Sequence, residues 1–117
     1  MFHMRYAQKS DAPFWFSLDA HLSADGFQKK VRDNEGYIIE NGGRPAGVLR
    51  HQPWWDHIPF LSFLHLQAGS RNKGLGTQAV LYWESEMRQL GYVDKGSIFF
   101  DGTPLHQPQK LIRIKAL

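Results

Sequence analysis

Hydrophobic periodicity divides the first part of the chain into a strand and a helix. Phe2 to Ala7 alternates in part between apolar and polar positions, which predicts a first strand. A helix is expected to follow Ser10 or Asp11, either of which can cap it, with Pro13 tolerated in its first turn. Its apolar residues recur at helical spacing: Phe14, Trp15, Leu18 and Leu22.

A second, short helix is expected to begin after Ser23. Phe27 and Val31 lie four residues apart and predict its buried side. The remaining positions carry a small basic cluster: Lys29, Lys30 and Arg32. We interpret this cluster as a solvated helix face.

The middle of the chain alternates as strands do. Tyr37 to Glu40 predicts a strand, Asn41 to Gly43 a tight hairpin turn, and Pro45 to Arg50 the returning strand. The segment from Ile58 to Gln67 is long and mostly apolar, which is typical of a central strand covered on both faces.

A loop from Ser70 to Gly76 leads into a helix expected to run from Leu75 to about Leu90 and to end at Gly91. Apolar residues occupy one face of this helix: Ala79, Val80, Trp83, Met87 and Leu90. Two further strands are expected, from Tyr92 to Phe100 and from Leu111 to Ala116.

The resulting order is β-α-α-β-β-β-α-β-β, which predicts an α/β fold of the α+β type. The segment from Ile58 to Phe100 is a candidate right-handed crossover, and the hairpin from Tyr37 to Arg50 makes the expected sheet mixed. We expect residues 1–117 to form a single domain, since a chain of this size buries a substantial core.

Composition narrows the setting and the partners. The chain has no cysteine, no long apolar segment and no apolar signal region, so we expect a cytoplasmic protein without a membrane partner. The net charge of +3 comes from scattered basic residues. Nucleic-acid binders usually concentrate such charge on one face, so we expect no nucleic-acid partner, whereas an anionic cofactor suits this charge.

The loop from Arg71 to Thr77 has the composition of a diphosphate site. The first amides of a helix have no partner within the helix and carry partial positive charge. Gly74 and Gly76 allow close approach to the backbone, and Arg71 and Lys73 add cations. The loop is not a P-loop, because Thr77 follows Gly76 directly, and it is not the dinucleotide fingerprint, whose third glycine is replaced by Ala79.

The sequence from Leu66 to Gly76 resembles the signature of the GNAT acetyltransferase superfamily. That signature has an aliphatic residue on the fourth strand, followed by Arg/Gln-x-x-Gly-x-Gly/Ala, and Arg71 to Gly76 fits it. The resemblance continues to Met87, and the stretches from Tyr37 to Arg50 and from Trp55 to Leu61 resemble a bacterial subfamily.

The resemblance implies a GNAT-like fold and an N-acetyltransferase that uses acetyl-CoA and no metal. The backbone of His65, Leu66 and Gln67 would hold the pantetheine arm and the thioester carbonyl. The cofactor loop would hold the pyrophosphate: Arg71, Asn72, Lys73, Gly74, Leu75, Gly76 and Thr77. The acceptor would be a primary amine of a small molecule or peptide. A CoA-binding or dimerising GNAT remnant with little activity is the alternative.

One strand and one helix of the family fold have no counterpart here. Leu90-Gly91-Tyr92 combines two sequence contexts that are separate in the subfamily, which implies an internal deletion after the signature helix. The deleted part carries the tyrosine that often protonates the leaving thiolate, so no residue inherits that role. Such a deletion would open the sheet beside Ile58 to Gln67. We expect the strand from Tyr92 to Phe100 to move into the vacant position, and we expect a homodimer because one moved strand cannot replace the lost helix cover.

Catalytic residues therefore stay open, and His65 and Tyr92 are weak candidates. Tyr82 is a second phenol of suitable chemistry. Other possible bases are Asp19, His21 and Asp56. The aromatic residues that could line an acceptor pocket, though core packing is the simpler interpretation, are Trp15, Trp54, Trp55 and Phe60.

Overall fold

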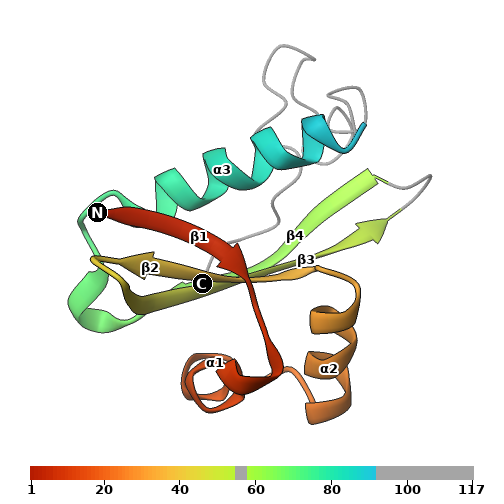
Figure 1. Cartoon of the computed structure of the whole chain (residues 1–117), viewed down its shortest axis with the longest axis horizontal. Coiled ribbons are helices and arrows are strands. Elements are labelled where there is room, and N and C mark those ends of the chain that lie inside the picture. Colours follow the sequence, from red (N-terminus) through yellow and green to blue (C-terminus); the bar gives the residue numbers. More distant parts are fainter. Residues whose placement is uncertain (55–57, 92–117) are drawn as a thin grey trace.

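The computed structural model describes residues 1–54 and 58–91, in which one sheet lies between helices (Figure 1). Its strands are β1 (Phe2–Tyr6), β2 (Gly36–Asn41), β3 (Arg44–Trp54) and β4 (Ile58–Leu66). Its α-helices are α1 (Ala12–Leu18), α2 (Ala24–Arg32) and α3 (Leu75–Gln89). Short 3-10 turns, η1 (Lys9–Asp11) and η3 (Ala68–Ser70), precede α1 and follow β4. The predicted order is confirmed as far as α3.

The four described strands form an antiparallel sheet in the order β1-β2-β3-β4. The register pairs Tyr6 with Tyr37 across β1 and β2, and Gly47 with Leu66 across β3 and β4. A register shift between Arg50 and His51 bends β3 beside β4. The far side of β4 has no neighbour among the described strands. The predicted strands from Tyr92 to Phe100 and from Leu111 to Ala116 lie outside the described residues.

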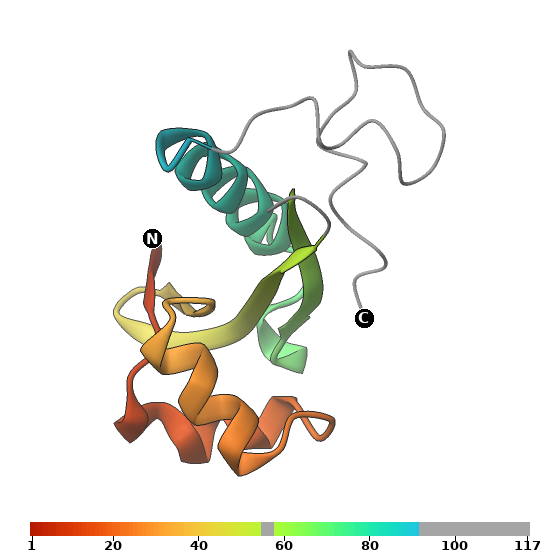
Figure 2. The same ribbon diagram turned by 90° about the vertical axis from the view of Figure 1, so that its right-hand side faces the viewer.

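Helix α3 covers one face of the sheet and the pair α1 and α2 covers the other (Figure 2). The α3 side is filled by Met4, Tyr37, Ile39, Leu49, Leu61, Leu64, Ala79, Val80, Trp83 and Met87. The α1 and α2 side is filled by Ala7, Trp15, Phe27, Ile38, Val48 and Phe63. Because β4 contributes to both sets, the prediction that this strand is covered on both faces is confirmed.

Local signals set the starts of α1 and α2. Pro13 lies in the first turn of α1, as predicted, but Asp11 does not cap the helix with its side chain. The Asp11 carboxylate instead accepts hydrogen bonds from Nη1 and Nη2 of Arg5 at 2.8 and 2.9 Å. Ser23 caps α2 by accepting the amide of Gly26 at 2.9 Å, which follows the predicted start.

Two predicted helix features differ in the structure. Helix α1 ends at Leu18, although Leu22 still packs in the same core from the following turn. Leu90 lies just beyond the end of α3 and is 61% exposed, so it does not extend the apolar face. The helix ends as predicted at Gly91, whose φ of 97° is left-handed and whose amide donates to Arg88 O at 3.0 Å.

Lys30 is not part of a solvated face, because it is only 9% exposed. Its Nζ donates to Glu35 Oε1 at 3.0 Å and to the carbonyl of His51 at 2.7 Å. The buried ammonium is therefore neutralised and ties α2 to β3. Lys29 and Arg32 remain exposed, as expected for the outer side of α2.

Candidate functional site

The end of β4 is pressed closely against β3. A Cβ atom on Gly47 would lie 2.8 Å from the carbonyl oxygen of His65 and 3.2 Å from Cα of Leu66. No side chain fits there without moving the backbone, so glycine at this position lets the two strands meet. The amide of Gln67 extends the ladder by donating to Ala46 O at 2.8 Å.

The register determines which main-chain groups of β4 bond to β3 and which point to the opposite edge of the strand. Hydrogen-bonded and non-hydrogen-bonded pairs alternate along an antiparallel ladder. Because Gln67 bonds to β3, the main chain of His65 also faces β3, whereas Leu64 and Leu66 direct theirs to the opposite edge. The alternation thus directs the main chain of Leu66 away from β3 and that of His65 and Gln67 toward β3. That these three residues hold the pantetheine arm stays a prediction.

The loop between η3 and α3 contains two residues in the left-handed region. Asn72 has a φ of 63° and Gly74, the N-cap of α3, has a φ of 77°. The N-cap provides no side-chain hydrogen bond, so it leaves the first amides of α3 uncapped. The amides of Leu75, Gly76 and Thr77 therefore face the loop with the positive end of the helix dipole.

Side chains in this first turn leave the backbone accessible. Leu75 is buried beneath the helix and Gly76 is half-buried, whereas Thr77 is exposed. A Cβ atom on Gly76 would meet nothing nearer than Leu66 Cδ1 at 3.8 Å and Leu64 Cδ2 at 3.9 Å. The packing of the described residues therefore leaves room for a Cβ atom at Gly76.

The two predicted cations of the loop lie differently. Arg71 folds back onto the end of β4, where its Nε donates to Leu66 O at 3.1 Å. Its Nη2 lies 3.1 Å from Nε2 of His65. Lys73 is exposed in the loop itself, beside the left-handed Asn72. Both side chains are exposed, and the structure places that of Arg71 against the end of the strand.

His65 lies on the α1 and α2 side of the sheet. Its ring is 6.0 Å from that of Phe63, which belongs to the core on that side. Alternation along β4 thus points the imidazole away from α3 and toward the guanidinium of Arg71.

Asp19 is fully buried in an ion pair on the same side of the sheet. Its Oδ2 accepts from Arg50 Nε at 2.8 Å and from Trp15 Nε1 at 3.1 Å, and its Oδ1 accepts from the amide of His21 at 3.0 Å. Burial acts to raise the pKa of Asp19, but these donors, Arg50 foremost, hold the pKa below its usual value. A carboxylate with this environment is a poor proton acceptor, and it joins α1 to β3.

The other predicted catalytic and pocket residues do not come together. Tyr82 is 39% exposed on α3, where its ring lies 6.5 Å from that of Tyr37 and 6.3 Å from that of Phe2. His21 is exposed, and Trp15 and Phe60 are buried. Trp54 ends β3. Tyr92, Asp56 and Trp55 lie outside the described residues.

His51 is a buried polar residue that the periodicity did not indicate. It is 7% exposed, and its ring lies 5.8 Å from Tyr37 and 5.7 Å from Trp83. Neither ring nitrogen has a hydrogen-bond partner in the described part of the chain. Burial, followed by the positive charge of Lys30, lowers the pKa of His51 to about 4, so the ring is neutral. In the sequence, the only sign of this buried histidine was its position in a strand directly after Arg50.

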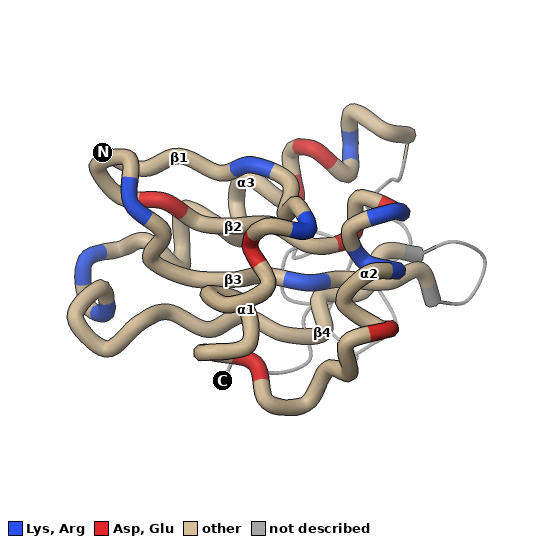
Figure 3. Tube along the Cα trace, turned by 60° about the horizontal axis from the view of Figure 1, so that its bottom comes forward, with Lys and Arg blue, Asp and Glu red and all other residues tan. Residues whose placement is uncertain are grey.

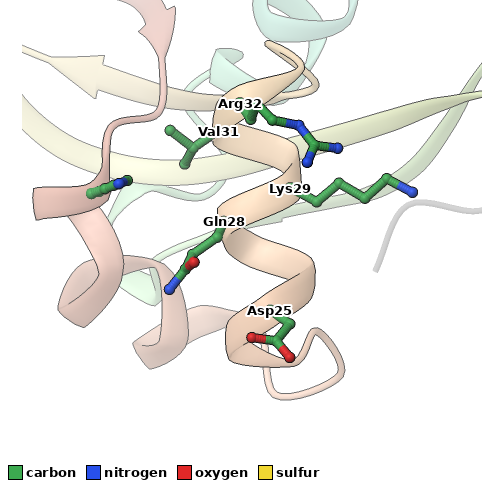
Figure 4. Close-up of a pocket in the computed structure, with 6 residues that line it drawn as sticks. Asp25, Gln28, Lys29, Val31 and Arg32 are labelled. Carbon is green, nitrogen blue, oxygen red and sulfur yellow. The ribbon is translucent and has the colours of Figure 1, made fainter.

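A surface hollow of about 420 Å³ lies beside α2, away from the cofactor loop (Figure 4). It is lined by Lys9, Asp25, Gln28, Lys29, Val31 and Arg32, which include none of the predicted site residues. Basic segments also occur on β1 and β3, and acidic ones lie between them (Figure 3). Among residues 1–54 and 58–91, no group of His, Asp and Glu side chains has the arrangement of a metal site, and no helix is long and apolar enough to cross a bilayer.

Comparison with known proteins gives a consistent result. The model of the acetyltransferase (GNAT) family matches residues 3–101. The fold is similar to N-acetylglutamate synthase from Neisseria gonorrhoeae complexed with coenzyme A and N-acetyl-glutamate, with a TM-score of 0.69, 16% identity, and coverage of 79% of this chain and 24% of that one. No curated protein matches the sequence.

Two further solved structures share the fold. Ard1 from Thermoplasma volcanium has a TM-score of 0.68 and 10% identity, with 78% of this chain and 66% of that one covered. Naa50 from Arabidopsis thaliana, in complex with a bisubstrate analogue, CoA-Ac-MVNAL, has a TM-score of 0.60 and 10% identity, with 75% and 65% covered. The chain thus spans about a quarter of the synthase and just under two thirds of the other two proteins.

Proposed function

The chain belongs to the acetyltransferase (GNAT) family, and on this basis we propose that it transfers an acetyl group from acetyl-CoA to a primary amine. The observation that carries the proposal is the uncapped start of α3 at the end of β4. There the amides of Leu75, Gly76 and Thr77 can donate to the pyrophosphate, and Gly76 presents no side chain in their way. Asn72 and Lys73 complete the cofactor loop.

The thioester arm would extend from this loop along the edge of β4 that faces away from β3. Leu64 and Leu66 direct their main-chain groups to that edge. Because the Leu66 carbonyl already accepts from Arg71, the Leu66 amide and the main-chain groups of Leu64 are those with which an extended amide-containing arm can pair as a strand would. This direction places the thioester beside the sheet and leaves the α1 and α2 side for the acceptor.

The reaction is a direct transfer. The nitrogen of the neutral amine forms a bond to the acetyl carbon, the carbon–sulfur bond breaks, and the sulfur leaves as a thiolate. The amine loses one proton and the thiolate gains one, so CoA and an N-acetylated product result. Amide donors that hold the cofactor and the carbonyl in place contribute by positioning and by stabilising the developing oxyanion.

The acceptor is proposed to be a small-molecule or peptide amine. One similar structure contains N-acetyl-glutamate and another contains a bisubstrate analogue with a peptide portion. A single site that accepts a primary amine accommodates both classes, so the choice between them needs a panel of amino acids, polyamines and peptides.

Turnover with such a panel tests the proposal, together with a mass spectrum of the ligand that copurifies. Retention of CoA without turnover of any amine would support the alternative, a CoA-binding protein without appreciable activity. Failure to bind CoA by calorimetry would refute both.

We also expect a homodimer in a cytoplasmic setting, with residues 1–117 as one domain. The edge of β4 is taken by the thioester arm in this proposal, so we expect the second copy to cover the surface left by the missing strand and helix. Light scattering at micromolar concentration tests this expectation, and a monomer whose mass does not change with concentration would contradict it.

A further inference from the structure

The guanidinium of Arg71 contacts two successive residues of β4. Its Nε donates to the carbonyl oxygen of Leu66 at 3.1 Å, and its Nη2 lies 3.1 Å from Nε2 of His65. A hydrogen bond from a charged donor is stronger than a neutral one. Arg71 therefore links the start of the cofactor loop to the end of β4, on the side opposite α3.

These contacts meet the strand at the edge that faces away from β3. The carbonyl of Leu66 points to that edge, and Gly47 presses on the same residues from the β3 side. Leu66 is thus held between Gly47 and Arg71, one on each edge of the strand. Any ligand that pairs with this outer edge meets a strand end that Arg71 already contacts.

The contact with His65 also defines the state of that imidazole. A guanidinium carries only donors, so Nε2 of His65 must accept the hydrogen bond with its lone pair. The proton of the neutral ring is then on Nδ1, and neither nitrogen offers a lone pair to an ammonium. While Arg71 is in contact, His65 is a hydrogen-bond acceptor and not a general base.

From these contacts we infer that Arg71 is a positioning residue that acts through the end of β4 and not through the phosphates of the cofactor. This inference rests on the proposed binding of CoA. Arg71 holds the Leu66 carbonyl and the His65 ring, and these shape the edge on which the thioester arm lies. Lys73, exposed in the same loop, is the cation that meets the phosphates.

The role of Arg71 at the strand end and that of Lys73 at the phosphates can be distinguished with a ligand that lacks the nucleotide part of the cofactor. Binding of acetyl-CoA and of S-acetylpantetheine, which has the thioester arm but no diphosphate, is measured for wild type, Arg71→Ala and Lys73→Ala. Arg71→Ala should weaken both ligands by a similar factor of roughly tenfold, the size of one hydrogen bond from a charged group. Lys73→Ala should weaken acetyl-CoA alone.

An Arg71→Ala variant that loses affinity for acetyl-CoA but not for S-acetylpantetheine would overturn the inference and leave the proposed function intact. An unchanged affinity for both ligands would overturn it as well. A wild-type protein that binds neither ligand would instead refute the proposed function.

A second measurement needs no ligand. Nitrogen chemical shifts of the neutral His65 ring should show a protonated Nδ1 and an unprotonated Nε2, and Arg71→Ala should change this pattern. His65→Gln, which keeps an acceptor, should bind S-acetylpantetheine nearly as well as wild type, whereas His65→Leu should match the loss of Arg71→Ala. A protonated Nε2 in the wild type would contradict the contact.

Discussion

Replacing Gly76 by alanine should stabilise the fold, whereas replacing it by a bulky residue should weaken cofactor binding. The added Cβ meets only Leu66 Cδ1 at 3.8 Å and Leu64 Cδ2 at 3.9 Å, which are ordinary contacts. Glycine within a helix costs about 0.5–1 kcal/mol relative to alanine. The free energy of unfolding should therefore rise by about that amount, and the thermal midpoint by a few degrees.

Binding should weaken in a second variant, Gly76→Val, whereas alanine, which the GNAT signature also accepts at this position, should bind CoA nearly as well as glycine. The branched side chain of valine would restrict the space through which a phosphate reaches the amides at the start of α3. Loss of one hydrogen bond to a charged group costs about 1.5–3 kcal/mol, which corresponds to roughly ten- to 150-fold in affinity. Thermal denaturation and calorimetry with CoA on the same preparation measure the two effects.

Two other glycines of this region supply controls. Gly69→Ala adds a methyl group in open space before the loop and should leave the affinity for CoA unchanged. Gly74→Ala also enters open space, but the φ of 77° strains any side chain, so this variant should lose about 1–2 kcal/mol of stability. If Gly76→Val still bound CoA as wild type does, the amides of α3 would not be the phosphate site.

The remaining predictions concern pH and the phenols. An unfolded histidine titrates near pH 6.5, whereas buried His51 titrates at about 4, so the unfolded chain takes up the extra proton as the pH falls between these values. Stability should therefore fall by up to about 3 kcal/mol across this window, and His51→Phe, which keeps the ring packing, should abolish that fall in denaturant titrations. A dedicated acid contributes about 10²–10⁴-fold, so Tyr82→Phe and Tyr92→Phe should each cost less than tenfold in turnover. A loss near a thousandfold in either variant would identify the acid.

Local chemistry explains why most elements could be predicted. Ser23 supplies a cap that needs only the next three residues, and Gly91 adopts a left-handed φ that few other residues tolerate. Apolar spacing on α3 likewise identifies its buried face as far as Met87. Such signals are contained within one turn or one element, so the sequence displays them without knowledge of the fold.

Features that depend on tertiary contacts could not be predicted in this way. Lys30 looks like part of a basic helix surface, and only its contacts with Glu35 and the His51 carbonyl explain its burial. Asp19 and Arg50 are 31 residues apart and meet because α1 packs on the sheet. Leu90 follows the apolar period but extends past the sheet, so its side chain remains exposed. In each case tertiary packing determines the burial or the ion pair of the residue, and the periodicity of the sequence does not show which distant residues it meets.

The same distinction applies to the site. The cofactor loop is contiguous, so its glycines and cations reveal it together, whereas a base and an acid must come from separate elements. Two of the candidate bases are already engaged: His65 accepts from Arg71, and Asp19 holds Arg50 and two further donors. In the proposed reaction, a protein with these groups committed to structure would rely on positioning the thioester and on the fraction of amine that is already neutral. Rigid placement of the strand end by Gly47 and Arg71 would then be the main contribution that the described residues make to that reaction.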